Sequence, residues 1–223
     1  MIGQSAEEIT QHPQWKEGDF EIVSSDGVRF CVPSLTLLLI SEVFRHMIET
    51  GSGIKNIQID ETAATIEMFL EFVSTGKVTF IPKAGPLCYD RPLNLVHFVN
   101  KHDCEVTLQH LKNYAHVPVT GKDNNYMRML LAMHLNQPRV VAELIQDRPG
   151  MFSWLHPIEH RRPVDRLSSQ LSFDIFQRIP HQYLWALTAA GLHLHDQRDP
   201  AYANDRAPAE RFLWFMRECL FVE

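Results

Sequence analysis

The chain has 223 residues, of which 45% are hydrophobic and 22% are charged, the composition of an ordinary globular protein. This length allows one large domain or two small ones. No apolar run approaches the roughly 18 residues that a membrane span needs. The first ten residues carry two glutamates and no basic residue, unlike a signal peptide. We therefore expect an intracellular protein, cytoplasmic or nuclear, with no membrane partner.

Charge and cysteine content exclude two further classes of function. Residues 1–116 hold 15 acidic and 9 basic residues, whereas residues 117–223 hold 12 of each. Neither half is basic enough to bind a phosphate backbone by releasing counterions, so we expect no direct binding of nucleic acid. The four cysteines lie far apart and form no C-x-x-C pair, which argues against a zinc knuckle.

A β-hairpin is the first predicted element. Residues 20–24 and 28–32 are short, rich in β-forming residues and roughly alternating. Asp26 and Gly27 lie between them, and an Asp-Gly pair in this position is a strong turn signal because the tight turn needs positive φ. Pro33 then ends the second strand, since proline cannot donate a hydrogen bond to a sheet.

Two short helices and a third strand are predicted next. Ser34 can cap a helix over residues 35–40, and Ser41 can cap another over residues 42–50. Residues 57–59 then form a short apolar-polar-apolar strand.

An amphipathic helix is predicted to begin at Thr62, with Gly76 as its C-cap. Its apolar face contains Phe69, and the apolar stripe of the preceding helix contains Phe44, so we expect both side chains in the core. Residues 78–81 favour a fourth strand. Helical periodicity then predicts helices at residues 93–101, 105–115, 126–135, 139–147, 167–178, 183–194 and 209–221.

A change of character marks a domain boundary near residue 117. Pro118, Gly121 and the polar residues 123–125 indicate a loop there. Beyond it the chain shows helical periodicity and no strand pattern. The sequence therefore predicts an α+β fold: a mixed sheet with helices, followed by an all-helical region.

The order of these elements resembles the BTB/POZ fold, a small mixed sheet flanked by helices. The predicted hairpin is similar to the opening of that family. Residues 33–47 are similar to its most specific stretch, in which a leucine-rich turn is followed by a serine (Ser41), an aromatic residue (Phe44) and a methionine (Met47). Two later segments are also similar to the family: the strand at residues 57–60 and the end of the helix at residues 69–76. The resemblance implies domains at 1–17 (an N-terminal segment), 18–116 (BTB/POZ-like) and 117–223 (helical).

The chain also departs from the family pattern. Residues 30–33 (Phe-Cys-Val-Pro) stand where a histidine is usual, as in a divergent subset similar to the Skp-type adaptors of F-box ligases. Residues 1–17 leave little room for the strand and helix that dimeric members exchange.

Residues 117–223 are similar to the helical extension of fungal BTB proteins. The resemblance implies a non-enzymatic adaptor or scaffold, either a cullin-linked ubiquitin-ligase adaptor or a transcriptional factor, that forms a homodimer or heteromer through the BTB-like domain.

One motif supports an alternative, a metal-dependent hydrolase. His156, Glu159 and His160 match H-x-x-E-H, which places two zinc ligands one helical turn apart with a glutamate beside the bound water. Pro157 lies inside the motif and Pro163 soon follows, which opposes the helix it requires. We therefore expect an exposed loop there, and no cofactor, metal site or catalytic residue in the chain.

The remaining candidate residues point to partner contacts. Met47, Ile48 and Glu49 match the hydrophobic-x-Glu pattern that some BTB domains use to engage a cullin scaffold, although they fall inside a helix. Arg161 and Arg162 form either a solvated loop or a site for an anion or an acidic partner. The last helix is rich in aromatic and aliphatic residues that predict a buried face, with an exposed partner patch as the alternative: Phe212, Leu213, Trp214, Phe215, Met216 and Leu220.

Overall fold

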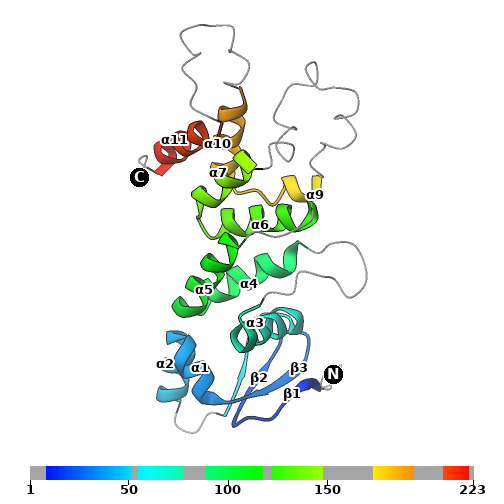
Figure 1. Ribbon diagram of the computed structural model, residues 1–223. Helices are drawn as coiled ribbons and strands as arrows, with labels where there is room; N and C mark the ends of the chain where they lie inside the picture. Colours follow the sequence, from blue (N-terminus) through cyan, green and yellow to red (C-terminus); the bar gives the residue numbers. More distant parts are fainter. Residues whose placement is uncertain are drawn as a thin grey trace, which may run out of the picture. The chain divides into compact units, whose positions relative to one another are not determined.

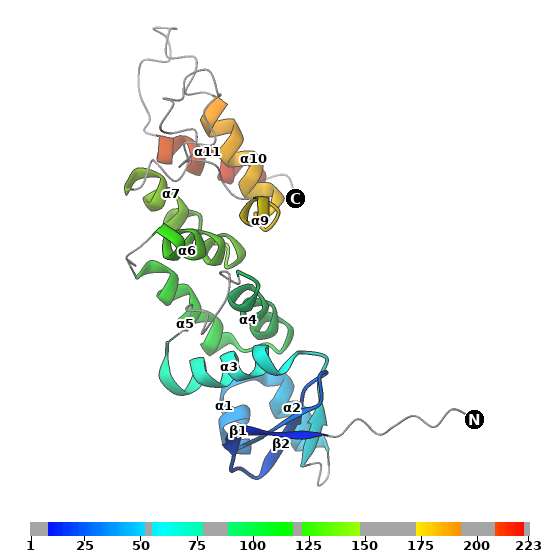
Figure 2. The ribbon, with the colours of Figure 1, turned by 90° about the vertical axis from the view of Figure 1, so that its right-hand side faces the viewer.

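The computed structural model describes residues 9–51, 55–77, 89–117, 122–147, 173–192 and 208–220. The chain divides into two compact units, Met1–Leu111 and Lys112–Glu223. The first unit combines a four-stranded sheet with helices, and the described part of the second is helical (Figures 1 and 2). The expected α+β fold class is therefore confirmed.

The sheet has the strand order β1-β3-β2-β4. Strands β2 (Phe20–Val23) and β3 (Val28–Val32) form the predicted antiparallel hairpin, and Gly27 has the positive φ of +76° that the turn requires. The short strand β4 (Asn56–Gln58) pairs in parallel with β2, one residue earlier than predicted. Phe20 and Ile22 point into the core, as the alternation of the strand predicts.

Strand β1 (Thr10–Lys16) was not predicted. It pairs in parallel with β3 and so belongs to the same sheet, within the residues expected to form a separate N-terminal segment. Its one buried side chain, His12, stacks on Phe30 with the ring centroids 4.6 Å apart. Pro13 is tolerated because β1 is an edge strand.

The helices α1 (Ser34–Ile40) and α2 (Glu42–Thr50) follow the hairpin as predicted, but Ser34 does not cap α1. Ser34 is the first helical residue, and both its backbone N–H and its hydroxyl donate to the carboxylate of Asp19, at 2.7 and 2.6 Å. A carboxylate 15 residues earlier in the chain therefore caps this helix. The hydroxyl of Ser41 accepts from the backbone N–H of Phe44 at 3.0 Å, which confirms the predicted N-cap of α2.

The N-terminus of helix α3 (Ala63–Thr75) is likewise capped by a distant residue. Asp26, in the hairpin turn, accepts from the backbone N–H of Ala63 at 2.8 Å. Gly76 ends the helix in the left-handed conformation, which confirms the predicted C-cap. The views in Figures 1 and 2 agree that α3 lies between the sheet and α4 (Asp90–Lys101).

The core of the first unit is aromatic. Phe44 and Phe69 are fully buried, as predicted, and both rings lie near Phe98 of α4, with centroids at 6.4 and 4.5 Å. Helix α4 begins three residues before its predicted start and is followed by α5 (Glu105–His116), in which the division between the two units falls. The predicted strand at 78–81 lies outside the described residues.

The second unit contains α6 (Lys122–His134), α7 (Pro138–Asp147), α9 (Phe173–Phe176), α10 (His181–Leu192) and α11 (Pro208–Leu220). The buried guanidinium of Arg128, on α6, donates to the backbone carbonyls of Ala115 (2.7 Å) and His116 (3.3 Å) and so caps the end of α5. Of the helix predicted at 167–178, the described part is α9 and the turn after it. No helix among the described residues is long and apolar enough to cross a membrane.

Candidate partner-binding surface

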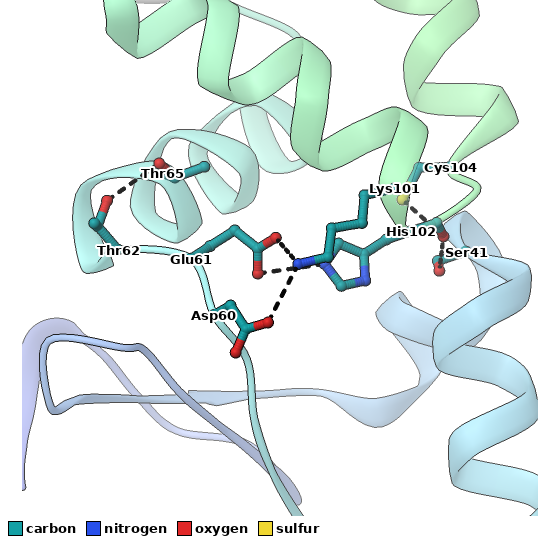
Figure 3. A network of polar contacts seen from close by, with 8 residues as sticks. All are labelled: Ser41, Asp60, Glu61, Thr62, Thr65, Lys101, His102 and Cys104. Carbon is teal, nitrogen blue, oxygen red and sulfur yellow. Dashed lines mark hydrogen bonds and ion pairs between the residues drawn. The ribbon is translucent and has the colours of Figure 1, made fainter.

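A cluster of polar contacts in the first unit surrounds His102, between α4 and α5 (Figure 3). Its ring is 7% exposed and stacks on Phe44 with centroids 5.0 Å apart and an interplanar angle of 8°. Neither ring nitrogen makes a hydrogen bond with a described residue. Nε2 lies 3.5 Å from an oxygen of Glu61, which precedes α3. Aromatic packing, more than hydrogen bonding, therefore holds this ring.

The charges around His102 are balanced mainly by Lys101. Its ammonium lies 2.7 Å from Glu61 and 3.8 Å from the exposed Asp60. Burial raises the pKa of the Glu61 carboxyl, but the hydrogen bond and charge of Lys101, together with His102, outweigh this and leave the pKa below its usual value. Burial lowers the pKa of His102, and the nearby carboxylate offsets this only in part. His102 is therefore neutral at neutral pH, and Lys101 is the cation paired with Glu61.

The cluster has the residue types of a nucleophilic triad, but its connections are structural. The hydroxyl of Ser41 donates to the backbone carbonyl of His102 and not to the imidazole, so no base can take its proton. The neighbouring thiol, Cys104, is buried, which raises its pKa to about 12 and leaves it unreactive at neutral pH. These contacts tie the start of α2 to the connection between α4 and α5.

A second feature, a hollow of about 420 Å³, lies on the outer face of the sheet. Polar residues dominate its lining, among them Arg29, Asn56 and Gln58. The guanidinium of Arg29 is already 3.8 Å from the carboxylate of Glu21. The hollow therefore offers neither a cluster of like charge nor a nucleophile beside a base.

Helix α1 presents an exposed apolar pair on a firmly held helix. Leu35 and Leu39 are 63% and 65% exposed, and their spacing of four residues places them on one face. Leu37 lies on the opposite face and is fully buried, which fixes the orientation of the helix. Two exposed leucines on one face of a helix are a candidate contact surface for another protein.

Both ends of α1 are anchored by charged side chains. At its start, the hydrogen bonds from Ser34 lower the pKa of the Asp19 carboxyl, so this carboxylate stays ionised and remains an acceptor. At its end, the guanidinium of Arg45 donates twice to the backbone carbonyl of Leu38, at 3.0 and 2.9 Å. Arg45 also pairs with Glu42 at 2.7 Å. The exposed leucines are therefore displayed by a helix with a defined position in this unit.

The sequence-predicted partner residues fall partly on this region. Met47, Ile48 and Glu49 lie within α2, the helix packed beside α1; the first two are half-buried and Glu49 is exposed. The leucine pair was not singled out from the sequence, because α1 has leucines on every face and only the burial of Leu37 in the structure shows which face is exposed.

The other predicted candidates lie outside the described residues. These are Arg161, Arg162 and the H-x-x-E-H residues His156, Glu159 and His160. Among the residues that are described, no group of three or more histidine, cysteine, aspartate or glutamate side chains could hold a metal ion.

Comparison with known proteins adds no assignment. No family model matches the sequence, and no curated protein matches it.

Proposed function

We propose that this chain is a non-enzymatic adaptor that binds other proteins, and that its first unit is a BTB/POZ-like module with α1 in the contact surface. The observation that carries the proposal is the pair of leucines on α1, each nearly two thirds exposed on a helix fixed at both ends. Burying such a pair releases water from apolar surface, worth about 25 cal/mol per Å².

The order of elements in the first unit supports the BTB/POZ-like part of the proposal. A hairpin is followed by two short helices, a strand, a helix and a helix pair, the order in which the sequence resembles that family. Within this proposal, Met47, Ile48 and Glu49 on α2 are the residues for a cullin scaffold. A cullin-linked ligase adaptor and a transcriptional or scaffold factor are two forms of the same function, in the cytoplasm or the nucleus.

The polar cluster around His102 supports the non-enzymatic part. Its serine, histidine and glutamate are used to join α2, α3 and α4, and its thiol has a pKa of about 12. These side chains therefore stabilise the module that displays α1.

The proposal is tested by quantitative proximity labelling in the native cell. The test variant is Leu35→Ser with Leu39→Ser, and the matched control is Val106→Ser, which alters an exposed apolar residue (53%) on α5. We expect the test variant to lose labelling of a defined set of proteins by about tenfold, a loss of roughly 1.4 kcal/mol of binding energy. The control should keep that set.

Thermal unfolding must accompany the labelling experiment. Both variants change exposed side chains, so their melting temperatures should stay close to that of the wild type. A normally folded double variant that labels the same proteins to the same extent as the wild type would show that α1 is not the contact surface.

A further inference from the structure

The charged residues of helix α11 follow the same order whether the helix is read from its N-terminus or from its C-terminus. Its central residues read Glu210, Arg211, Phe, Leu, Trp214, Phe, Met, Arg217 and Glu218. The order acid, base, aromatic centre, base, acid is symmetric about Trp214. An interface between two identical chains related by a two-fold axis must be complementary to itself, and a symmetric charge order is one way to meet that demand.

The structure places these charges on the outer face of α11. Phe212 is fully buried and Met216 is 1% exposed, so this side faces the interior of the second unit. Trp214 is 46% exposed, against the sequence expectation that it belongs to the buried face. Glu210, Arg217 and Glu218 are exposed and Arg211 is half-buried. All four lie three or four residues from Trp214 and therefore surround it.

A second tryptophan enlarges the apolar centre. Trp185, on α10, is 48% exposed and meets Phe215 edge to face at 5.3 Å. Trp214 contacts the same ring at 4.8 Å. Figures 1 and 2 agree that α10 and α11 lie side by side. Two half-exposed tryptophans held on one buried phenylalanine form a rigid aromatic surface with the composition of an interface centre.

The four charges do not neutralise one another within α11. Side chains on one helix pair at spacings of three or four residues, but the opposite charges here are either adjacent or seven residues apart. None of the four makes an ion pair with another residue in the described part of the chain. Their complement is therefore available only from outside this group.

Two antiparallel copies of α11 supply that complement. We place the two-fold axis at the level of Trp214. Position 211 of one copy then lies near position 218 of the other copy, on the same side of the helix pair. Arg211 then faces the partner's Glu218, and Arg217 faces the partner's Glu210. The two Trp214 rings meet at the centre. Each copy thus contributes to four ion pairs around an aromatic contact.

We propose that this chain forms a two-fold dimer through α11, centred on Trp214. This interaction is separate from the proposed adaptor function and uses a surface of the second unit. One helix with a neighbouring tryptophan from each copy is a small interface, so the dimer is weak and reversible. Because exposed ion pairs surround its centre, it also weakens as salt is added.

Two double variants of equal net charge test the geometry in the full chain. Arg211→Glu with Glu218→Arg exchanges the members of one facing pair, so opposite charges still meet. Glu210→Arg with Arg211→Glu brings like charges together at every facing position. Sedimentation velocity over low micromolar to near-millimolar concentrations measures the dimer. We expect the first variant to keep the wild-type dissociation constant within about threefold and the second to raise it by about tenfold or more.

Further variants separate this surface from others. Trp214→Ala should abolish the dimer and leave the melting temperature almost unchanged, because the side chain is half exposed. Leu35→Ser with Leu39→Ser should leave the dimer intact, whatever it does to other partners. The proposal is overturned by a wild-type chain that stays monomeric at every concentration. It is also overturned by equal dissociation constants for the two charge variants, or by a dimer that is lost only in the leucine variant.

Discussion

Buried His102 makes the stability of the first unit depend on pH. Burial lowers the pKa of this imidazole below 6.5, so the folded state holds it neutral. In the unfolded chain the same group takes up its proton near pH 6.5. Between these two pKa values the unfolded state binds more protons, and acid therefore favours unfolding. The stabilisation is complete above pH 6.5 and is lost as the pH falls towards the folded pKa.

Because His102 binds only one proton, its effect on the free energy of unfolding has an upper limit. A single group changes the free energy of unfolding by at most about 1.4 kcal/mol per pH unit. The carboxylate of Glu61, 3.5 Å from Nε2, offsets only part of the cost of burying the charged ring. Glu61 causes a second loss of stability at lower pH. The pKa of its carboxyl is lowered in the folded state, so the stabilisation it provides is lost only as the pH falls below the unfolded pKa of 4.5.

Urea unfolding of the full chain from about pH 8 to about pH 5 measures this dependence. Hydrogen exchange, corrected for intrinsic rates, assigns it to the first unit. In the variant His102→Leu we expect stability to fall less steeply as the pH drops below 6.5, by at most the one-proton limit of about 1.4 kcal/mol per pH unit. The control Val106→Ser, at an exposed residue of α5 without a titratable side chain, should keep the wild-type slope. An unchanged slope in the leucine variant would refute the assignment to His102.

Two further predictions concern buried side chains. Phe69→Ala should lower the free energy of unfolding by about 3–5 kcal/mol, because the ring is fully buried against Phe98; a melting temperature within a couple of degrees of the wild type would contradict this. Arg128→Met should cost about 1–3 kcal/mol, because it leaves the carbonyls of Ala115 and His116 without their donor. Faster hydrogen exchange near the end of α5 should accompany that loss.

Local signals predicted most of the secondary structure. The hairpin, the start of α2 and the end of α3 each depend on residues within a few positions: Asp26 and Gly27 for the turn, Ser41 for the N-cap and Gly76 for the C-cap. Each acts through a backbone conformation or hydrogen bond of its own neighbourhood. A single sequence shows such effects directly.

Long-range contacts account for the errors. Ser34 looked like the cap of α1, but it is a helical residue whose own backbone N–H and hydroxyl donate to the carboxylate of Asp19. Strand β1 lacks an alternating pattern and contains Pro13; it is held by pairing with β3 and by His12, which lies 3.6 Å from Glu67 of α3. These stabilising partners are 15 to 55 positions away in the chain, beyond any local pattern.

The contrast between α1 and α11 shows what the sequence does and does not say about surfaces. Both helices are rich in apolar residues around much of their circumference, so hydrophobicity alone cannot tell the buried side from the exposed side. In α11 the charges at 210, 211, 217 and 218 mark the outward face, and Trp214 lies at its centre. In α1 no charged residue marks a face. Only the burial of Leu37 in the folded unit shows that Leu35 and Leu39 must point outward.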